Sequence, residues 1–210
     1  PGILSARSVA PALAAGNAVI LKPDPRPAVS GGLFIAAVAE AAGFPEGLLH
    51  VLPGGADVGA ALVDHAQVPV ISFTGSTAAG RAVGAAGAAK LKRVHLELGG
   101  NNALIVLDDV DVAAAASAGA WGSFLHQGQI CMTTGRHIVH ESVYDEYVSL
   151  LTEKALNIPV GDTGASDVPL GPIIDERQRD KVHALVEGSR AAGARVTAGG
   201  EYDGLFYKPT

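Results

Sequence analysis

Residues 70–98, with the sequence VISFTGSTAAGRAVGAAGAAKLKRVHLEL, contain the pattern that decides the fold. An apolar run at 70–74 is followed by an alanine-rich stretch at 77–89 with helical spacing, and then by a second apolar run at 94–98. A strand, a helix and another strand in this order are typical of two parallel strands joined by a crossover helix. The segment therefore predicts a β-α-β unit.

The same alternation continues on both sides of this unit. Short apolar runs predict further strands at 17–22, 48–52, 103–107 and 136–140. Stretches with helical spacing predict helices at 28–42, 56–65, 112–125, 141–156 and 175–192. We therefore expect an α/β protein built from parallel sheets and crossover helices. Gly99 and Gly100 interrupt a strand, so we expect a seam between two lobes there.

The composition excludes several classes of function. The chain has 210 residues, 48% of them hydrophobic, and a net charge of -6, so non-specific binding to nucleic acid or to an anionic membrane is not expected. The sequence has no apolar stretch long enough to span a bilayer and no secretory signal, which makes the cytoplasm the expected compartment. Seven scattered histidines predict no metal site.

Cys131 is the only cysteine, so it cannot form an internal disulfide. It lies in the stretch GQICMTTGR at 128–136, between an expected helix and an expected strand. A thiol in a glycine-flanked loop is accessible, and its thiolate is a strong nucleophile. The alternative interpretation is an inert cysteine that only fills space, as most free cysteines do.

Glu97 lies between two leucines at the end of an apolar strand. A carboxylate in apolar surroundings is harder to ionise and can act as a base near neutral pH. The alternative is that Glu97 occupies the polar face of its strand and points to water.

Two further positions suit a dinucleotide. Gly75 and Ser76 stand where a strand passes into a helix, and the N–H groups of a helix N-terminus bind phosphate well; a simple Ser cap is the alternative. Lys22 ends a strand before Pro23, and ligands of such sheets collect beyond the carboxyl ends of the strands. A solvated lysine is the alternative there.

Taken together, these motifs resemble the aldehyde dehydrogenase superfamily over the whole chain. The phrases that carry the resemblance are VAPALAAGN at 9–17, KP at 22–23, FTGST at 73–77, LELGG at 96–100 and GQIC at 128–131. The resemblance implies an NAD(P)-binding lobe in residues 1–98 and a catalytic lobe in residues 99–210, each of them partial. It also implies that the chain covers only the middle of a family member.

The resemblance also implies the role of each site residue. Cys131 would attack the aldehyde carbon to give a thiohemiacetal, and Glu97 would activate the water that hydrolyses the later thioester. The remaining assignments concern the cofactor: Lys22 for the adenosine ribose, Gly75 and Ser76 for the pyrophosphate, Gly59 and Gly80 for close backbone packing, and Leu98 at the end of the cofactor lobe.

The expected cofactor is NAD, with NADP tolerated. Many family members have a carboxylate three residues after the lysine, where this chain has Pro25. Asp24 could take over that role, while Arg26 removes a reason to reject the 2′-phosphate of NADP.

The substrate is expected to be an aromatic aldehyde. The stretches KPDPR at 22–26, WGSFLHQ at 121–127 and DGLFY at 203–207 look similar to benzaldehyde and vanillin dehydrogenases. Trp121 and Phe124 are three apart on one helix and could wall a pocket for an aryl ring, or they could be ordinary core aromatics.

Some family residues have no counterpart in the chain. The family's oxyanion-hole asparagine would lie two residues before Pro1, and a later ribose-binding glutamate would lie beyond Thr210. We therefore expect the 210 residues alone to be inactive and the parent to be an enzyme, which we expect to be a homo-oligomer. Two alternative hypotheses for the function are a cysteine acyl-transferase or hydrolase that works without a dinucleotide, and a non-catalytic module that kept the fold.

Overall fold

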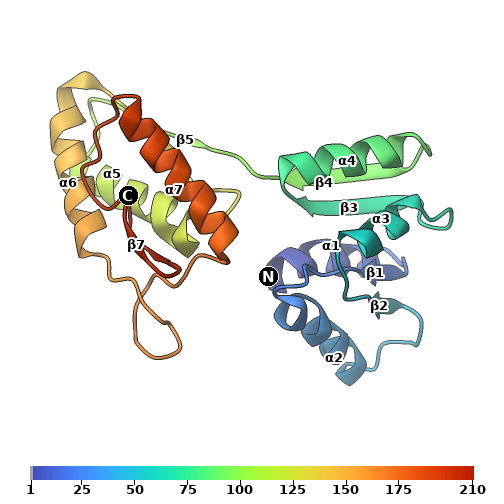
Figure 1. The fold of residues 1–210 in the computed structure, drawn as a ribbon. Helices are drawn as coiled ribbons and strands as arrows, with labels where there is room; N and C mark the ends of the chain where they lie inside the picture. Colours follow the sequence, from blue (N-terminus) through green and yellow to red (C-terminus); the bar gives the residue numbers. More distant parts are fainter. Residues whose placement is uncertain (1) are drawn as a thin grey trace. The chain divides into compact units, whose positions relative to one another are not determined.

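The computed structural model describes residues 2–210 and shows a mixed α/β chain in which every long strand pair is parallel. The chain divides into two compact units, Pro1–Leu98 and Gly99–Thr210, which can be followed by colour in Figure 1. The cofactor and catalytic roles that the sequence suggests for residues 1–98 and 99–210 stay predictions. Within residues 2–210, no helix is both long and apolar enough to cross a membrane.

The first unit contains two parallel strand pairs. Strand β1 (Val19–Leu21) pairs with β2 (Leu49–Val51), and β3 (Val70–Gly75) pairs with β4 (Arg93–Leu98). The strands predicted at 17–22, 48–52, 70–74 and 94–98 are thus confirmed. Since paired parallel strands end at the same edge, Gly75 is the register partner of Leu98, and Thr74 is the partner of Glu97.

The helices of the first unit cover these strands. They are α1 (Gly2–Ala14), α2 (Phe34–Ala41) with a π-helical turn before it (η1, Val29–Leu33), α3 (Ala56–Asp64) and α4 (Thr77–Ala88). Helix α1 was not predicted from the sequence. It contains Pro11, which removes a helical hydrogen-bond donor, and it is tied to β3 by a hydrogen bond of 2.9 Å between the Ser8 and Ser72 hydroxyls.

Helix α4 lies along β4 because its glycines leave room for the strand's side chains (Figure 1). A Cβ atom at Gly80 would meet the side chain of Leu98, with Cδ1 only 2.9 Å away, and one at Gly87 would meet Val94 and Ile71. The alanine-rich helix of the β-α-β unit is therefore fitted to its sheet by small residues at the points of contact.

The second unit is built around one parallel pair, β5 (Ala103–Val106) and β6 (Arg136–Val139), with helices α5 (Val112–Phe124), α6 (Tyr144–Asn157) and α7 (Glu176–Ala191). A short 3-10 turn, η3 (Glu141–Val143), precedes α6. Strands β7 (Tyr202–Asp203) and β8 (Phe206–Tyr207) form an antiparallel hairpin. The predicted α/β architecture with parallel strand pairs is confirmed. The hairpin was not predicted, because two-residue strands leave no periodic signal in the sequence.

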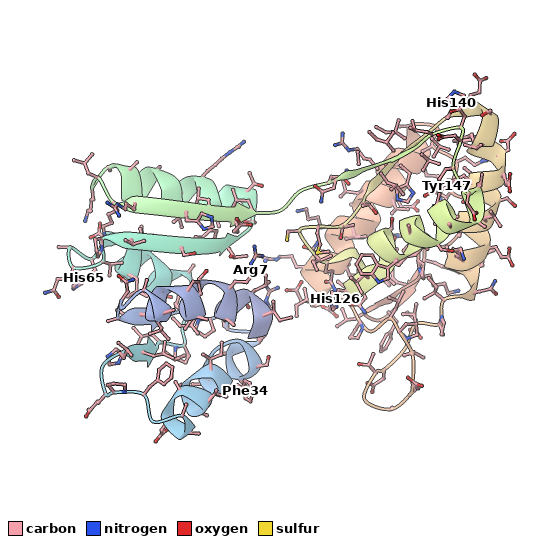
Figure 2. The ribbon with its side chains drawn as sticks, turned by 180° about the vertical axis from the view of Figure 1, so that it is seen from behind. Arg7, Phe34, His65, His126, His140 and Tyr147 are labelled. Atoms are coloured by element: carbon pink, nitrogen blue, oxygen red, sulfur yellow. The ribbon has the colours of Figure 1, made fainter. Side chains whose placement is uncertain are left out.

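The core of the second unit lies between α5, α6 and the β5–β6 pair. Val106, Val112, Ala116 and Tyr147 are its buried members, and Tyr147 is only 1% exposed. Its side chain lies between α6 and α5 (Figure 2), where Gly119 leaves space for the ring hydroxyl. Helix α5 begins at Asp111, whose carboxylate accepts a hydrogen bond of 3.0 Å from the Ala114 N–H. The core thus fixes the helix that leads to the cysteine.

Candidate active site

Cys131 lies in the loop between α5 and β6, and it is exposed. Its backbone carbonyl oxygen accepts a hydrogen bond of 3.1 Å from Nδ2 of Asn102, which also reaches the Thr133 carbonyl oxygen at 3.3 Å. The thiol is therefore accessible on a loop whose backbone is held. The interpretation of Cys131 as an inert buried cysteine does not fit this exposure.

The loop begins with an unusual backbone. His126, Gln127 and Gly128 have φ angles of 52°, 58° and 67°, three successive residues in the left-handed region. Residues in the left-handed region cannot continue a right-handed helix, so α5 does not extend into the loop. At His126 and Gln127, which are not glycine, this conformation is also strained. The Thr133 hydroxyl donates to the Gly128 carbonyl oxygen at 3.0 Å, so the two ends of the loop are joined.

A chain of polar groups holds the far side of the loop. The Thr134 carbonyl oxygen accepts from the Ser123 hydroxyl at 2.8 Å and lies 3.0 Å from Nε2 of His137. On the other side of the ring, Nδ1 of His137 lies 2.8 Å from the Tyr147 hydroxyl. Burial lowers the pKa of His137 below its ordinary value. A neutral imidazole with its proton on Nε2 fits both contacts, because a carbonyl oxygen can only accept.

Glu97 stands near the end of β4 in the first unit, with a side chain that is 41% exposed. Its carboxylate lies 3.9 Å from the guanidinium of Arg7 on α1 and 3.4 Å from Nε2 of His95. The apolar surroundings expected from its two leucine neighbours are therefore not what the side chain meets. In a strand, adjacent side chains point to opposite faces, so Glu97 and His95 share the polar face.

Lys22 is fixed directly after β1. Its ammonium group donates to the carbonyl oxygens of Pro23 at 2.6 Å and Gly54 at 2.7 Å. Since Gly54 follows β2, both contacts lie at the carboxyl edge of the β1–β2 pair. The lysine stem lies over Gly59, where an added Cβ would be 3.4 Å from Cδ. Gly59 thus gives room to Lys22, and the solvated-lysine alternative does not describe this side chain.

Asp24 is held by Arg26. Nε and one terminal nitrogen of Arg26 each donate to the Asp24 carboxylate at 2.9 Å, and the Arg26 backbone N–H adds a third bond of 2.9 Å. These bonds lower the pKa of Asp24 to about 2, and the hydrogen bonds from the Arg26 side chain have the largest effect. The carboxylate is therefore ionised at neutral pH, with its charge balanced by Arg26.

Ser76 caps helix α4, and its hydroxyl accepts a hydrogen bond of 3.3 Å from the Ala79 N–H. Gly75 is the last residue of β3, directly before this cap, and its register partner Leu98 fills the space beside Gly80. The cap interpretation of Ser76 is thus seen in the structure, while the role of these four residues toward a cofactor stays a prediction.

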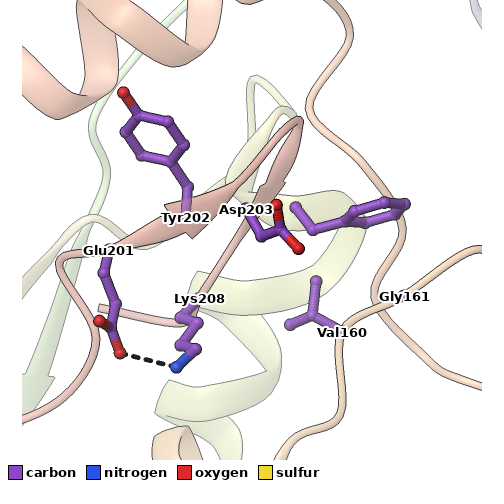
Figure 3. A pocket seen from close by; sticks show the side chains of 7 residues that line it. Val160, Gly161, Glu201, Tyr202, Asp203 and Lys208 are labelled. Carbon is purple, nitrogen blue, oxygen red and sulfur yellow. Dashed lines mark hydrogen bonds and ion pairs between the residues drawn. The ribbon is translucent and has the colours of Figure 1, made fainter.

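The other candidate features add little to the site. Trp121 is 61% exposed, whereas Phe124 is half-buried. A hollow of about 280 Å³ lies beside the β7–β8 hairpin, where Lys208 and Glu201 form an ion pair of 2.6 Å (Figure 3), but it includes none of the residues predicted for the site. No group of three metal-ligating side chains occurs among residues 2–210.

The structure brings some of the predicted residues together and leaves others as predictions. Within the first unit, Gly75 is the last residue of β3 and Glu97 the last but one of β4, so both lie at the same edge of the strand pair. Cys131 belongs to the second unit, so its approach to Glu97 stays a prediction. The oxyanion-hole asparagine, which is expected two residues before Pro1, falls outside the described residues.

Sequence reasoning missed Asn102, His137 and Arg7. Asn102 is the second residue after the LELGG phrase at 96–100 and carries an amide near a turn, which was the one signal available. His137 and Arg7 were indistinguishable from other histidines and arginines, because their contacts depend on the folded chain.

Comparisons with known proteins bear on this site. The aldehyde dehydrogenase family model matches residues 1–210. A vanillin dehydrogenase from Amycolatopsis sp. is 67% identical over 210 residues, which are 100% of this chain and 43% of the relative. A benzaldehyde dehydrogenase (NAD(+)) from Pseudomonas putida is 55% identical over the same length, again 43% of the relative. The chain thus spans under half the length of these curated relatives.

Solved structures give the same result for the fold. An aldehyde dehydrogenase from Bacillus cereus, described in an NAD+ complex, matches with a TM-score of 0.96 and 34% identity over 100% of this chain and 43% of that one. An NAD-dependent benzaldehyde dehydrogenase from Corynebacterium glutamicum matches with a TM-score of 0.92 and 44% identity over 98% of this chain and 45% of that one.

Proposed function

This chain belongs to the aldehyde dehydrogenase family, and from that premise we propose that the complete enzyme oxidises an aromatic aldehyde to its carboxylic acid with NAD. The observation that carries the proposal is the 67% identity to a vanillin dehydrogenase over all 210 residues. The 55% identity to a benzaldehyde dehydrogenase supports the same substrate class.

The nucleophile of the proposed reaction is Cys131. Its thiolate forms a bond to the aldehyde carbon, and the carbonyl oxygen becomes the oxyanion of a thiohemiacetal. The Cys131 backbone N–H is our candidate for part of the oxyanion hole. When bound, NAD would supply the hydride acceptor, and loss of hydride from this carbon would leave a thioester on Cys131.

Glu97 is the proposed base of the second half-reaction. A water attacks the thioester carbon while the Glu97 carboxylate takes a proton from that water. The carbon–sulfur bond then breaks, which releases the carboxylic acid and returns Cys131 as thiolate. The Glu97 side chain is 41% exposed, which supports this role because water can reach the carboxylate.

The first unit offers donors that fit a dinucleotide. The Lys22 ammonium lies at the carboxyl edge of one strand pair, and the Ser76 hydroxyl marks the N-terminus of α4 at the edge of the other. Phosphate oxygens and ribose hydroxyls are the groups that such donors bind. We propose Lys22 for the ribose and Ser76, with the backbone at Gly75, for the pyrophosphate. Gly59, Gly80 and Leu98 shape the surface beside them.

NAD is the proposed first choice, with NADP tolerated. Asp24 is ionised beside the lysine, and its charge disfavours a 2′-phosphate, while Arg26 balances that charge. The ratio of kcat/KM for the two cofactors on the complete enzyme tests this proposal. A ratio that favours NADP would contradict it.

The decisive experiment measures NADH formation by the complete enzyme with benzaldehyde, vanillin and hexanal. We expect faster turnover of the two aromatic aldehydes; equal turnover of hexanal and benzaldehyde would contradict the aromatic preference. Cys131→Ala is expected to lose at least about 1,000-fold in kcat. Glu97→Gln is expected to keep a burst of NADH and to lose steady-state turnover, because only thioester hydrolysis needs the base.

Calorimetry of NAD binding separates this proposal from a cysteine acyl-transferase or hydrolase. Such an enzyme would use Cys131 without a dinucleotide, so absence of NAD binding with intact thiol reactivity would favour it. A homo-oligomeric state and a cytoplasmic location are proposed for the complete enzyme, and light scattering and cell fractionation test them.

A further inference from the structure

We infer that Asn102 is a positioning residue for the nucleophile, and that it acts by holding the backbone carbonyl of Cys131. The inference rests on the proposed function, because it concerns how Cys131 is oriented for that reaction. Asn102 is not proposed to touch the aldehyde or the cofactor.

The contact is direct although the two residues are 29 positions apart in the sequence. Nδ2 of Asn102 donates to the Cys131 carbonyl oxygen at 3.1 Å and to the Thr133 carbonyl oxygen at 3.3 Å. One amide group therefore reaches the carbonyl of the nucleophile and the carbonyl two residues later. A single side chain thus fixes the direction of two peptide planes in the loop.

The backbone of Asn102 already attaches its segment to the second unit. Its N–H donates to the Thr133 carbonyl oxygen at 3.2 Å, and its own carbonyl oxygen accepts from the Arg136 N–H at 3.2 Å. These backbone bonds tie the residue before β5 to the residues around the start of β6. The side-chain amide is therefore not needed to hold the strands together, which leaves the orientation of Cys131 as its specific effect.

The segment that leads from Glu97 to Asn102 also approaches Cys131. Asn102 lies five residues after Glu97, and the intervening Gly99 and Gly100 carry no side chain. A Cβ at Gly100 would lie 3.6 Å from the Cys131 carbonyl oxygen, so this segment also approaches the nucleophile through its backbone. The segment that follows the proposed base thus holds the loop of the proposed nucleophile.

Orientation matters more than stability at this position. Asn102 is exposed, and a hydrogen bond that competes with water stabilises the fold only slightly. A misplacement of the attacking atom by about 1 Å can cost about 100-fold in rate. Loss of the amide is therefore expected to lower the rate of chemistry and to leave the melting temperature nearly unchanged.

The test compares three variants of the complete enzyme. Asn102→Leu keeps the volume and removes the amide, and Asn102→Gln retains an amide on a longer stem. Asn157→Ala is the matched control, because it removes another Nδ2 bond to a backbone carbonyl, that of Glu153 at 2.9 Å, from the end of α6 in the same unit. The readouts are the burst rate of NADH, the Kd for NAD, the melting temperature, and hydrogen exchange of residues 128–134.

We expect Asn102→Leu to slow the burst by about 10- to 100-fold, to speed exchange in residues 128–134, and to leave the Kd for NAD unchanged. Asn102→Gln should recover most of the rate, and Asn157→Ala should match the wild type. A wild-type burst and wild-type exchange in Asn102→Leu would overturn the inference. So would equal losses in the Leu and Gln variants that accompany a lowered melting temperature, since these would indicate a merely structural role.

The two proposals fail in different ways. A wild-type enzyme that forms NADH from no aldehyde would overturn the proposed function, and the exchange measurement would then decide separately whether Asn102 holds the loop. A wild-type enzyme that is active, with an Asn102→Leu variant equal to it, would overturn the positioning role alone.

Discussion

The hydroxyl of Tyr147 lies 2.8 Å from Nδ1 of His137, and Nε2 of the same ring lies 3.0 Å from the carbonyl oxygen of Thr134. The most buried large side chain of the second unit is thereby connected to the loop that carries Cys131. With the proton on Nε2 of His137, the Tyr147 hydroxyl donates to Nδ1, and Nε2 donates to the Thr134 carbonyl oxygen.

Tyr147→Phe should weaken the second unit. The variant keeps the buried ring but leaves Nδ1 of His137 without its donor, which is expected to cost about 1 kcal/mol of the free energy of unfolding. Urea titration of the complete enzyme measures the change. Tyr144→Phe is the control on the same helix, because Tyr144 is 47% exposed; equal effects of the two variants would contradict the prediction.

His137 should make stability depend on pH. Because burial lowers its pKa in the folded state, the unfolded chain binds a proton more readily. The stabilisation from neutral His137 is present above the ordinary pKa of about 6.5 and is lost as the pH falls through the lowered folded-state value. The melting temperature should therefore fall from pH 7 to pH 5 less in His137→Gln than in the wild type. An unchanged slope would refute this assignment.

Asp24 and Arg26 should set the cofactor ratio in opposite directions. Asp24→Asn frees the Arg26 guanidinium for a 2′-phosphate, whereas Arg26→Ala leaves the Asp24 carboxylate unbalanced. We expect kcat/KM for NADP relative to NAD to rise about tenfold in the first variant and to fall in the second. With a pKa of about 2, Asp24 gains a proton only in strong acid, so its titration should leave the wild-type ratio unchanged above about pH 7, where the 2′-phosphate is also fully ionised.

Gly80→Ala should destabilise the first unit, and Gly84→Ala should not. A Cβ at Gly80 would lie 2.9 Å from Cδ1 of Leu98, while one at Gly84 would lie 3.4 Å from Cδ1 of Leu96, an ordinary contact. Overpacking of this kind costs about 1–3 kcal/mol, whereas Ala for Gly in a helix gains up to about 1 kcal/mol. Thermal unfolding of both variants checks the opposite signs.

The sequence predicts most of the regular structure for a physical reason. Val70–Gly75 and Arg93–Leu98 combine an apolar run with flanking breakers, and α4 between them has a cap at Ser76. Helix α1 escaped prediction because Pro11 interrupts its signal. The β7–β8 hairpin escaped because two residues in each strand are too few to show alternation.

The candidate site could be predicted only in part. Cys131 and Glu97 stand in motifs that can be read along the chain. The contacts of Asn102 with Cys131 and of His137 with Ser123 join residues 29 and 14 positions apart, and nothing in local propensity specifies such pairs. The charged neighbours of Glu97 were missed for the same reason, because Arg7 comes from a distant helix.

The left-handed run at His126, Gln127 and Gly128 limits how this region can change in length. Two of its three residues are not glycine and hold a conformation that costs about 1–2 kcal/mol each, so contacts on either side impose it. One inserted or deleted residue between Phe124 and Cys131 would shift which residues occupy these angles and change the path of the backbone that leads to Cys131. Homologous enzymes should therefore vary here in residue type while they keep a constant number of residues between the end of the helix and the cysteine.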